Sequence, residues 1–154
     1  MATRAIIRVA KREEGVSFNE HPEEIRAQIY HHYDGYPEGL GCKLAEFLCD
    51  FRVVNGLPIN YFEDIKVANG MGCLTAQLVA SLKEEPGNVY IDYPYQDRFD
   101  IEFIYYIWGT EDKDIWMSIF TGPHNRDALK YAVEFHNDKC IFVGTPQKLI
   151  EKYQ

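Results

Sequence analysis

IEFIYYIWGTEDKDIWMSI, residues 101–119, is the stretch that decides the fold class. Large apolar side chains recur at every second position on both sides of the polar segment 109–114, which is typical of two half-buried strands joined by a short turn. Residues 3–10, 24–33 and 89–95 alternate in the same way, and 140–144 is a short apolar strand. We therefore predict a mostly antiparallel sheet, with its first two strands paired through a short polar connection.

Two other stretches have the spacing of amphipathic helices. The first runs to about residue 51 and the second covers 71–83; their apolar stripes are Leu40, Leu44, Phe47, Leu48 and Phe51, and Met71, Leu74, Leu78, Val79 and Leu82. Thr145 and Pro146 favour an N-cap and a first helical residue, so a short C-terminal helix should reach Tyr153. Segment 129–135 fits a strand or a helix, and its alternation favours a strand. The expected fold is α+β, with two main helices packed on one face of the sheet.

The composition narrows the class of protein. The chain has 154 residues, and we expect one domain spanning 1–154, because no repeat or linker interrupts it. A net charge of −8 disfavours general nucleic-acid binding. No apolar run is long enough for a signal peptide or a membrane span, so a cytoplasmic protein is expected. The four cysteines form no CxxC pair; they are expected to be free thiols, and we predict neither a metal site nor a cofactor.

YHHYDGYPEGLG, residues 30–41, is the least ordinary segment of the chain. His31 and His32 are neighbours on a strand, so their side chains should point to opposite faces and cannot easily bind one metal ion together. Asp34 and Gly35 suit a tight turn, in which we expect the glycine to adopt a positive φ. Gly39 and Gly41 fall where the first helix should begin, and unpaired amides there would suit an anion such as phosphate.

Two parts of the sequence carry a resemblance to a known group. Ala2-Thr3-Arg4 opens the first strand, and the second strand ends in H-x-D-G-Y-P-E-G, residues 32–39. This combination resembles small, mostly uncharacterised proteins encoded by bacteriophages and prophages, over about the first third of the chain. The resemblance implies a viral accessory protein acting in the bacterial cytoplasm. It implies no reaction, so it assigns no catalytic role.

Antiparallel pairing of the first two strands should bring the start of one next to the end of the other. Arg4 would then either pair with Asp34 or join His32 in facing an anionic ligand. The candidate ligand-binding residues are therefore Thr3, Arg4, His32, Asp34, Tyr36, Gly39 and Gly41. The alternative is structural: Arg4 and Asp34 merely anchor the turn, and Tyr33 and Tyr36 belong to the core.

Aromatic residues of the second half suggest a second candidate surface. On the outward faces of the predicted strands, a platform for a protein partner would consist of Tyr106, Trp108, Trp116 and Phe120, since Tyr and Trp dominate binding hot spots. The same hairpin would suit a homodimer interface. The alternative is that helices cover this face and that the four residues are core.

Three functions are compatible with these features. The first is a non-catalytic phage-type protein that binds a host factor or sequesters a small anionic ligand, as counter-defence proteins do; it is favoured because the sequence contains no complete catalytic set. The second is a small enzyme acting on nucleotides or nucleic acid, with His32 as general acid and base and Asp34 beside it. The third is an interaction module that needs no pocket.

Overall fold

The computed structural model describes residues 2–56, 66–98, 100–121 and 139–154. Its centre is a six-stranded sheet in the order β5-β2-β1-β6-β7-β8. The strands are β1 (Arg4–Lys11), β2 (Ile25–His31), β5 (Val89–Asp92), β6 (Ile101–Gly109), β7 (Trp116–Thr121) and β8 (Cys140–Gly144). Two short strands, β3 (Arg52–Val54) and β4 (Val67–Asn69), form a separate parallel pair. The fold is α+β, as the alternation of the sequence predicted.

The sheet is antiparallel except between β1 and β6. The hairpin predicted from residues 101–119 is confirmed, with Trp108 opposite Trp116 across its two strands. The pairing of β1 with β2 is also antiparallel, with Ala5 opposite His31. The parallel pairing of β1 with β6 was not predicted. It places the first strand in the middle of the sheet, where both of its faces are covered.

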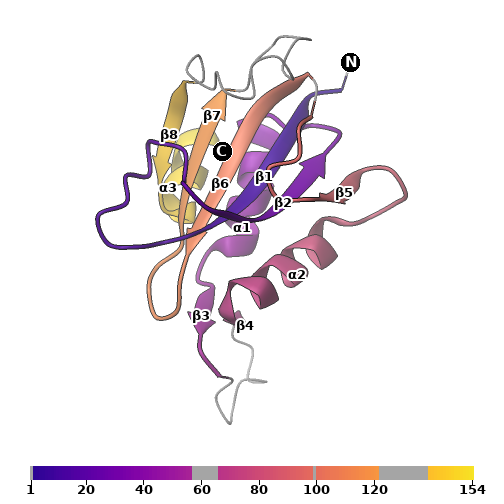
Figure 1. Cartoon of the computed structure of the whole chain (residues 1–154). Coiled ribbons are helices and arrows are strands. Elements are labelled where there is room, and N and C mark those ends of the chain that lie inside the picture. Colours follow the sequence, from indigo (N-terminus) through magenta and orange to yellow (C-terminus); the bar gives the residue numbers. More distant parts are fainter. Residues whose placement is uncertain (1, 57–65, 99, 122–138) are drawn as a thin grey trace.

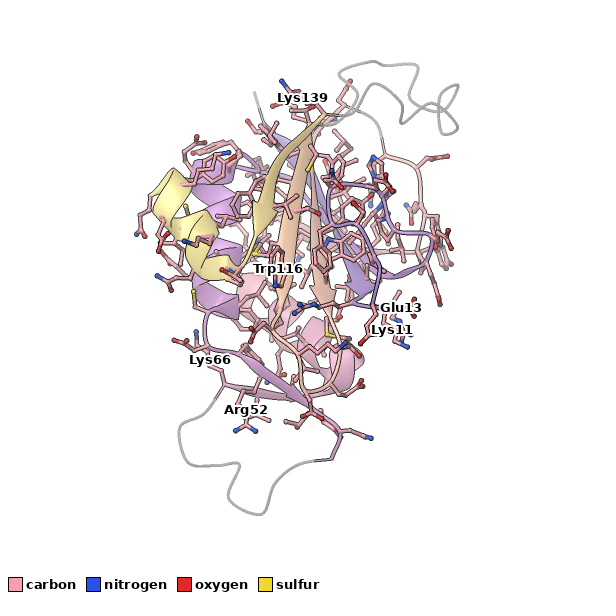
Figure 2. All side chains as sticks on the ribbon, turned by 90° about the vertical axis from the view of Figure 1, so that its left-hand side faces the viewer. Lys11, Glu13, Arg52, Lys66, Trp116 and Lys139 are labelled. Atoms are coloured by element: carbon pink, nitrogen blue, oxygen red, sulfur yellow. The ribbon has the colours of Figure 1, made fainter. Side chains whose placement is uncertain are left out.

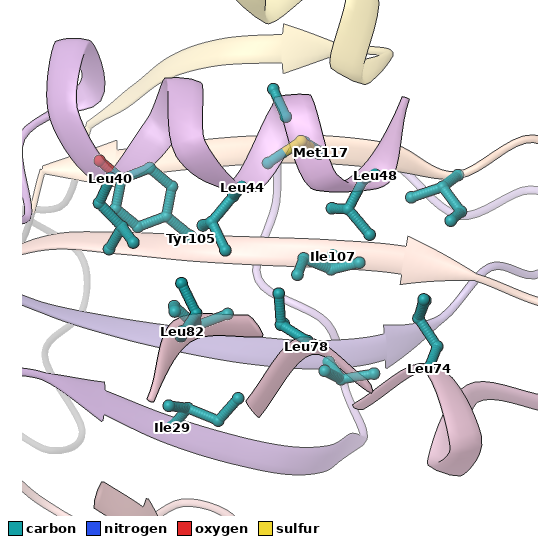
Figure 3. Close-up of a cluster of buried hydrophobic side chains, with 14 of the residues drawn as sticks. Ile29, Leu40, Leu44, Leu48, Leu74, Leu78, Leu82, Tyr105, Ile107 and Met117 are labelled. Atoms are coloured by element: carbon teal, nitrogen blue, oxygen red, sulfur yellow. The ribbon is translucent and has the colours of Figure 1, made fainter. Parts of the chain in front are cut away.

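The helices of the described residues all lie on one face of the sheet, which we call the helix face. They are α1 (Cys42–Leu48), α2 (Gly70–Leu82) and α3 (Pro146–Tyr153). Figure 3 shows the leucines of α1 and of the preceding turn over Tyr105, Ile107 and Met117, and those of α2 over β1 and β2. Thr145 caps α3 by accepting a hydrogen bond from the Lys148 amide, as predicted.

The helix boundaries differ slightly from the predicted ones. The first helical unit starts as a π turn, Pro37–Gly41, and α1 ends at Leu48 rather than near residue 51. Cys49 leaves the helical conformation and Asp50 has a φ of 59°, so the chain turns there before Phe51 can extend the helical stripe. The segment 129–135 lies outside the described residues. Within the described ranges, none of the helices has the length and apolar character needed to cross a bilayer.

The opposite face of the sheet is covered by residues 12–24, which we call the connector. Figure 1 shows it crossing in front of the sheet, between β1 and β2. The Phe18 ring stacks on Trp116 with 5.0 Å between centroids and meets the edge of Trp108 at 5.2 Å. An apolar cluster that includes Ile6, Ile104 and Phe120 continues on this connector face.

The expectation of an exposed aromatic platform is therefore wrong for three of its four residues. Tyr106, Trp108 and Phe120 are exposed to 0%, 1% and 3%, and Trp116 is half-buried. They do face away from the helices, as the alternation predicted. The alternative predicted burial beneath helices. The rings are buried, but by Val16, Phe18 and His21 of the connector and not by a helix of the described residues.

Candidate functional site

The ends of β1 and β2 meet, as the sequence predicted. The Gly35 amide donates to the Thr3 carbonyl over 2.9 Å, and the Tyr105 hydroxyl donates to the Gly35 carbonyl over 2.6 Å. Gly35 is required for a different reason from the predicted one. It is Asp34 that adopts a positive φ, of 53°, whereas a Cβ on Gly35 would lie 2.7 Å from the Ala5 Cβ.

The glycines of the next turn do not form the predicted anion cradle. The amide of Gly39 donates to the Tyr36 carbonyl over 3.0 Å, and that of Gly41 points at the same oxygen over 3.4 Å. The intervening Leu40 amide donates to the Asp34 carbonyl. Because the π turn folds back on its own backbone, these amides are not free to bind phosphate. Tyr36 is 39% exposed and its ring packs on Gly39.

Arg4, Tyr30 and His32 form a polar group on the connector face, which we call the corner. The Tyr30 hydroxyl and Nδ1 of His32 share a hydrogen bond of 2.7 Å. Burial raises the pKa of Tyr30, while the positive charges of Arg4 and Arg98 oppose that rise. Tyr30 is therefore a neutral phenol at physiological pH, next to two guanidinium groups.

Arg4 does not pair with Asp34. Its ion pair is with Asp100, at 3.6 Å between Nη1 and Oδ2, and both side chains are about one-third exposed or more. Asp34 is exposed, and among the described residues it makes no hydrogen bond to His32. Tyr33, which the structural alternative placed in the core, is 48% exposed and its ring meets that of His32 at 4.5 Å.

A line of buried polar side chains continues from the corner across the connector face. Residues opposite one another on five neighbouring strands form this polar rung, in the order Asp92, Gln28, Arg8, Tyr106 and Ser118. None of the five is more than 7% exposed. Buried charges are rare unless they are paired, so the rung is an unusual feature of this sheet.

Hydrogen bonds connect most of the rung. Arg8 donates from Nε to Gln28 Oε1 over 2.9 Å and from Nη1 to the Tyr106 hydroxyl over 3.2 Å. Gln28 in turn donates to Asp92 Oδ2 over 3.0 Å. At the far end, the Trp108 indole donates to the Ser118 hydroxyl. His21 of the connector bonds to the Tyr106 hydroxyl and stacks on Phe120.

Arg98 joins the polar rung to the corner. Its guanidinium binds both carboxylate oxygens of Asp92, and the Asp92 hydrogen bond raises the pKa of Arg98. The same group lies 4.2 Å from the centroid of the Tyr30 ring, within the range of a cation–π contact. The exposed Tyr90 ring is 5.8 Å from Tyr30. Corner and rung therefore make one connected polar system.

His31 lies on the other face of the same strand, as predicted. Its side chain is buried beneath the helix face, and within the described structure its Nδ1 has no hydrogen-bond partner. Burial lowers the pKa of His31, and the nearby Lys43 ammonium adds to this. Lys43 itself pairs with Glu84 at 2.9 Å. Among the residues described, no three His, Cys, Asp or Glu side chains are placed to hold a metal ion.

The comparisons with known proteins find no match to this chain among protein-family models, curated proteins or solved structures. The likeness of residues 2–4 and 32–39 to phage proteins stays a prediction. The candidate site is thus defined by geometry alone.

The sequence predicted Arg4 and His32 of the corner as candidate residues, but it did not indicate Tyr30 or the polar rung. Polar residues such as Arg8 and Gln28 in an alternating strand are ordinarily expected to face solvent, which hides their role in the sequence. The signal that was available is their register: antiparallel pairing of residues 3–10 with 24–33 sets Arg8 opposite Gln28. Asp92 and Tyr106 could not be added, because no sequence pattern pairs residues 89–95 or 101–109 with the first two strands.

Proposed function

We propose that this chain is a non-catalytic binding protein that takes a small anionic, nucleotide-like ligand at the corner. The observation that carries the proposal is the hydrogen-bonded pair of Tyr30 and His32 beside the guanidinium groups of Arg4 and Arg98. Guanidinium, imidazole and phenol groups can all donate hydrogen bonds to phosphate oxygens. They occur together on a chain whose net charge is −8, where a general affinity for anions is not expected.

Exposed aromatic rings favour a ligand that carries a base as well as a phosphate. Tyr33 and Tyr90 flank the corner and are 48% and 45% exposed. Base–aromatic stacking is worth about 1–3 kcal/mol per base in single-stranded nucleic-acid complexes. A phosphate at Arg4 and His32, with its base against one of these rings, would use both kinds of contact.

Binding is favoured over catalysis by the surroundings of His32. The enzyme hypothesis pairs His32 with Asp34, but that carboxylate is exposed and makes no bond to the imidazole in the described structure. The partner of Nδ1 is instead the neutral Tyr30 phenol, which orients the imidazole ring. Sequestering a ligand needs orientation alone. A phage-type accessory role in a bacterial cytoplasm would fit this activity and follows from the resemblance.

Calorimetric titration with pyrophosphate, nucleoside monophosphates and cyclic nucleotides tests the proposal. We expect at least one of these compounds to bind, and Arg4→Gln and His32→Gln each to weaken it about tenfold, equivalent to 1.4 kcal/mol. Arg52→Gln is the matched control, since Arg52 is exposed on β3 at the other end of the molecule (Figure 2). Equal affinity in all four proteins, or no binding by any compound, would refute the proposal.

Phosphorus NMR of the same mixtures distinguishes binding from turnover. The proposal predicts that the bound compound is recovered unchanged after prolonged incubation. Product formation that His32→Gln abolishes would instead support the enzyme hypothesis.

A further inference from the structure

A groove lies between helix α3 and β8, the edge strand at the opposite side of the sheet from β5. It encloses about 590 Å³ and is lined by Trp116, Ile141, Val143, Lys148 and Lys152, among others. Figure 2 looks onto this edge, with β8 beside α3 and Trp116 near the carboxyl end of the strand. The groove shares no residue with the corner or the polar rung, so a site in the groove is independent of the proposed function.

The outer edge of β8 is an available template for pairing. The sheet ends with this strand, so one side of its backbone has no strand partner in the described part of the chain. Such edges accept an additional strand unless they are blocked. Lys152 donates to the Ile141 carbonyl over 2.9 Å, so the cover on this acceptor is one exposed lysine side chain.

The charge of the groove selects the partner. Both charged side chains in its lining are lysines of α3, although the whole chain carries −8. The Lys148 side chain is 70% exposed and pairs at 3.5 Å with Glu151, itself 56% exposed, so a peptide carboxylate at Lys148 competes with a weak surface ion pair. Arg12 adds a third positive charge, since its guanidinium lies 5.6 Å from the centroid of the Trp116 ring. Acidic side chains are therefore complementary to this edge, whereas basic ones are repelled.

Apolar side chains complete the surface. Val143 of β8 is 37% exposed. Trp116, the first residue of the neighbouring strand β7, is half-buried next to the end of β8. An extended peptide presents alternate side chains to the same side. One set would contact these apolar groups while the neighbouring residues reach the lysines.

We propose that the groove between β8 and α3 binds an extended acidic segment of a partner protein, which adds a seventh strand to the sheet. The peptide backbone pairs with the outer edge of β8. Lys152 exchanges the Ile141 carbonyl for a peptide carboxylate, which frees that carbonyl to accept a peptide amide. Lys148 binds a second carboxylate, and apolar peptide side chains rest on Val143 and Trp116.

A fluorescein-labelled peptide of alternating glutamate and valine tests this proposal by fluorescence anisotropy. We expect binding that weakens as salt is added, because the ion pairs are exposed. An analogue with lysine in place of glutamate and one with alternate N-methylated amides should each bind at least tenfold more weakly. Dissociation constants for the glutamate peptide weaker than about 1 mM would overturn the proposal.

Variants with equal changes of charge locate the peptide. Lys148→Glu should lose at least tenfold in affinity, whereas Lys113→Glu, at the exposed turn between β6 and β7, should lose less than twofold. Amide resonances of Ile141 and Val143 should shift on titration. Equal binding by both variants, or unchanged resonances while anisotropy rises, would show that the groove is not the site.

Discussion

At the scale of single residues, Arg8 is the feature that most distinguishes this sheet from an ordinary apolar one. It lies in the middle of the polar rung, 6% exposed, and serves Gln28 and Tyr106 at once. Removing one member of a buried charged network leaves the others without partners, which costs about 3–5 kcal/mol. Arg8→Met should therefore lower the free energy of unfolding by about 3 kcal/mol in urea denaturation.

The matched control for Arg8 is Arg26 on the neighbouring strand. Arg26 is exposed, so Arg26→Met should change stability by less than about 0.5 kcal/mol. If both variants unfold at the same urea concentration as the unaltered protein, the polar rung does not stabilise the fold through Arg8.

His31 predicts how stability depends on pH. Burial lowers its folded pKa below the ordinary value of 6.5, so the unfolded chain binds the proton more readily. The contribution of His31 is fully present above pH 6.5 and is lost as the pH falls through the folded pKa. As the pH is lowered from 7 to about 5, the free energy of unfolding should therefore fall less in His31→Leu than in the unaltered protein. Parallel curves for the two proteins would contradict this.

Two glycines test the packing argument at the corner. A Cβ at Gly35 would meet the Ala5 Cβ at 2.7 Å, whereas one at Gly72 in α2 would meet nothing within 4 Å. Overpacking costs about 1–3 kcal/mol, and replacing a helical glycine gains up to about 1 kcal/mol. In thermal unfolding, the melting temperature of Gly35→Ala should be lower than that of the unaltered protein, and that of Gly72→Ala should be higher. The reverse order would place the close approach elsewhere.

At the scale of elements, the connector covers the face of the sheet that the described helices leave free. Phe18 fills the space between the rings of Trp108 and Trp116, which are the only two tryptophans of the chain. Phe18→Ala should therefore expose Trp116 and move the fluorescence emission to longer wavelength. Phe47→Ala serves as control, because Phe47 packs on Phe51 of the helix face. The same emission wavelength in both variants would contradict the claim that Phe18 covers Trp116.

The helices and the connector differed in how well they could be predicted. Leucines at helical spacing predict α2 to within one residue at each end, because a stripe must face a core. The connector has no periodic pattern, so its Val16 and Phe18 could not be distinguished from ordinary loop residues. The contacts of an irregular segment depend on where its two ends are held. The ends of the connector are held by β1 and β2, and the residues that lie beneath it belong to strands whose pairing no local pattern reveals.

At the scale of the whole molecule, local patterns predicted the class of fold but not the order of strands. Alternation identified the hairpin of β6 and β7, and the short connection between the first two strands predicted the pairing of β1 with β2. The parallel contact of β1 with β6 joins residues nearly one hundred positions apart, such as Arg8 and Tyr106. This contact completes the polar rung, which explains why the sequence did not indicate that Tyr106 lies beside Arg8.

The central claim is that the corner recognises an anion through His32, and its imidazole nitrogens report this most directly. Long-range proton–nitrogen NMR spectra recorded while pyrophosphate is added should show the His32 signals moving to saturation. Those of His31, buried on the opposite face of β2, should stay in place. Binding of pyrophosphate that leaves the His32 signals unchanged, or that moves both histidines equally, would contradict the claim.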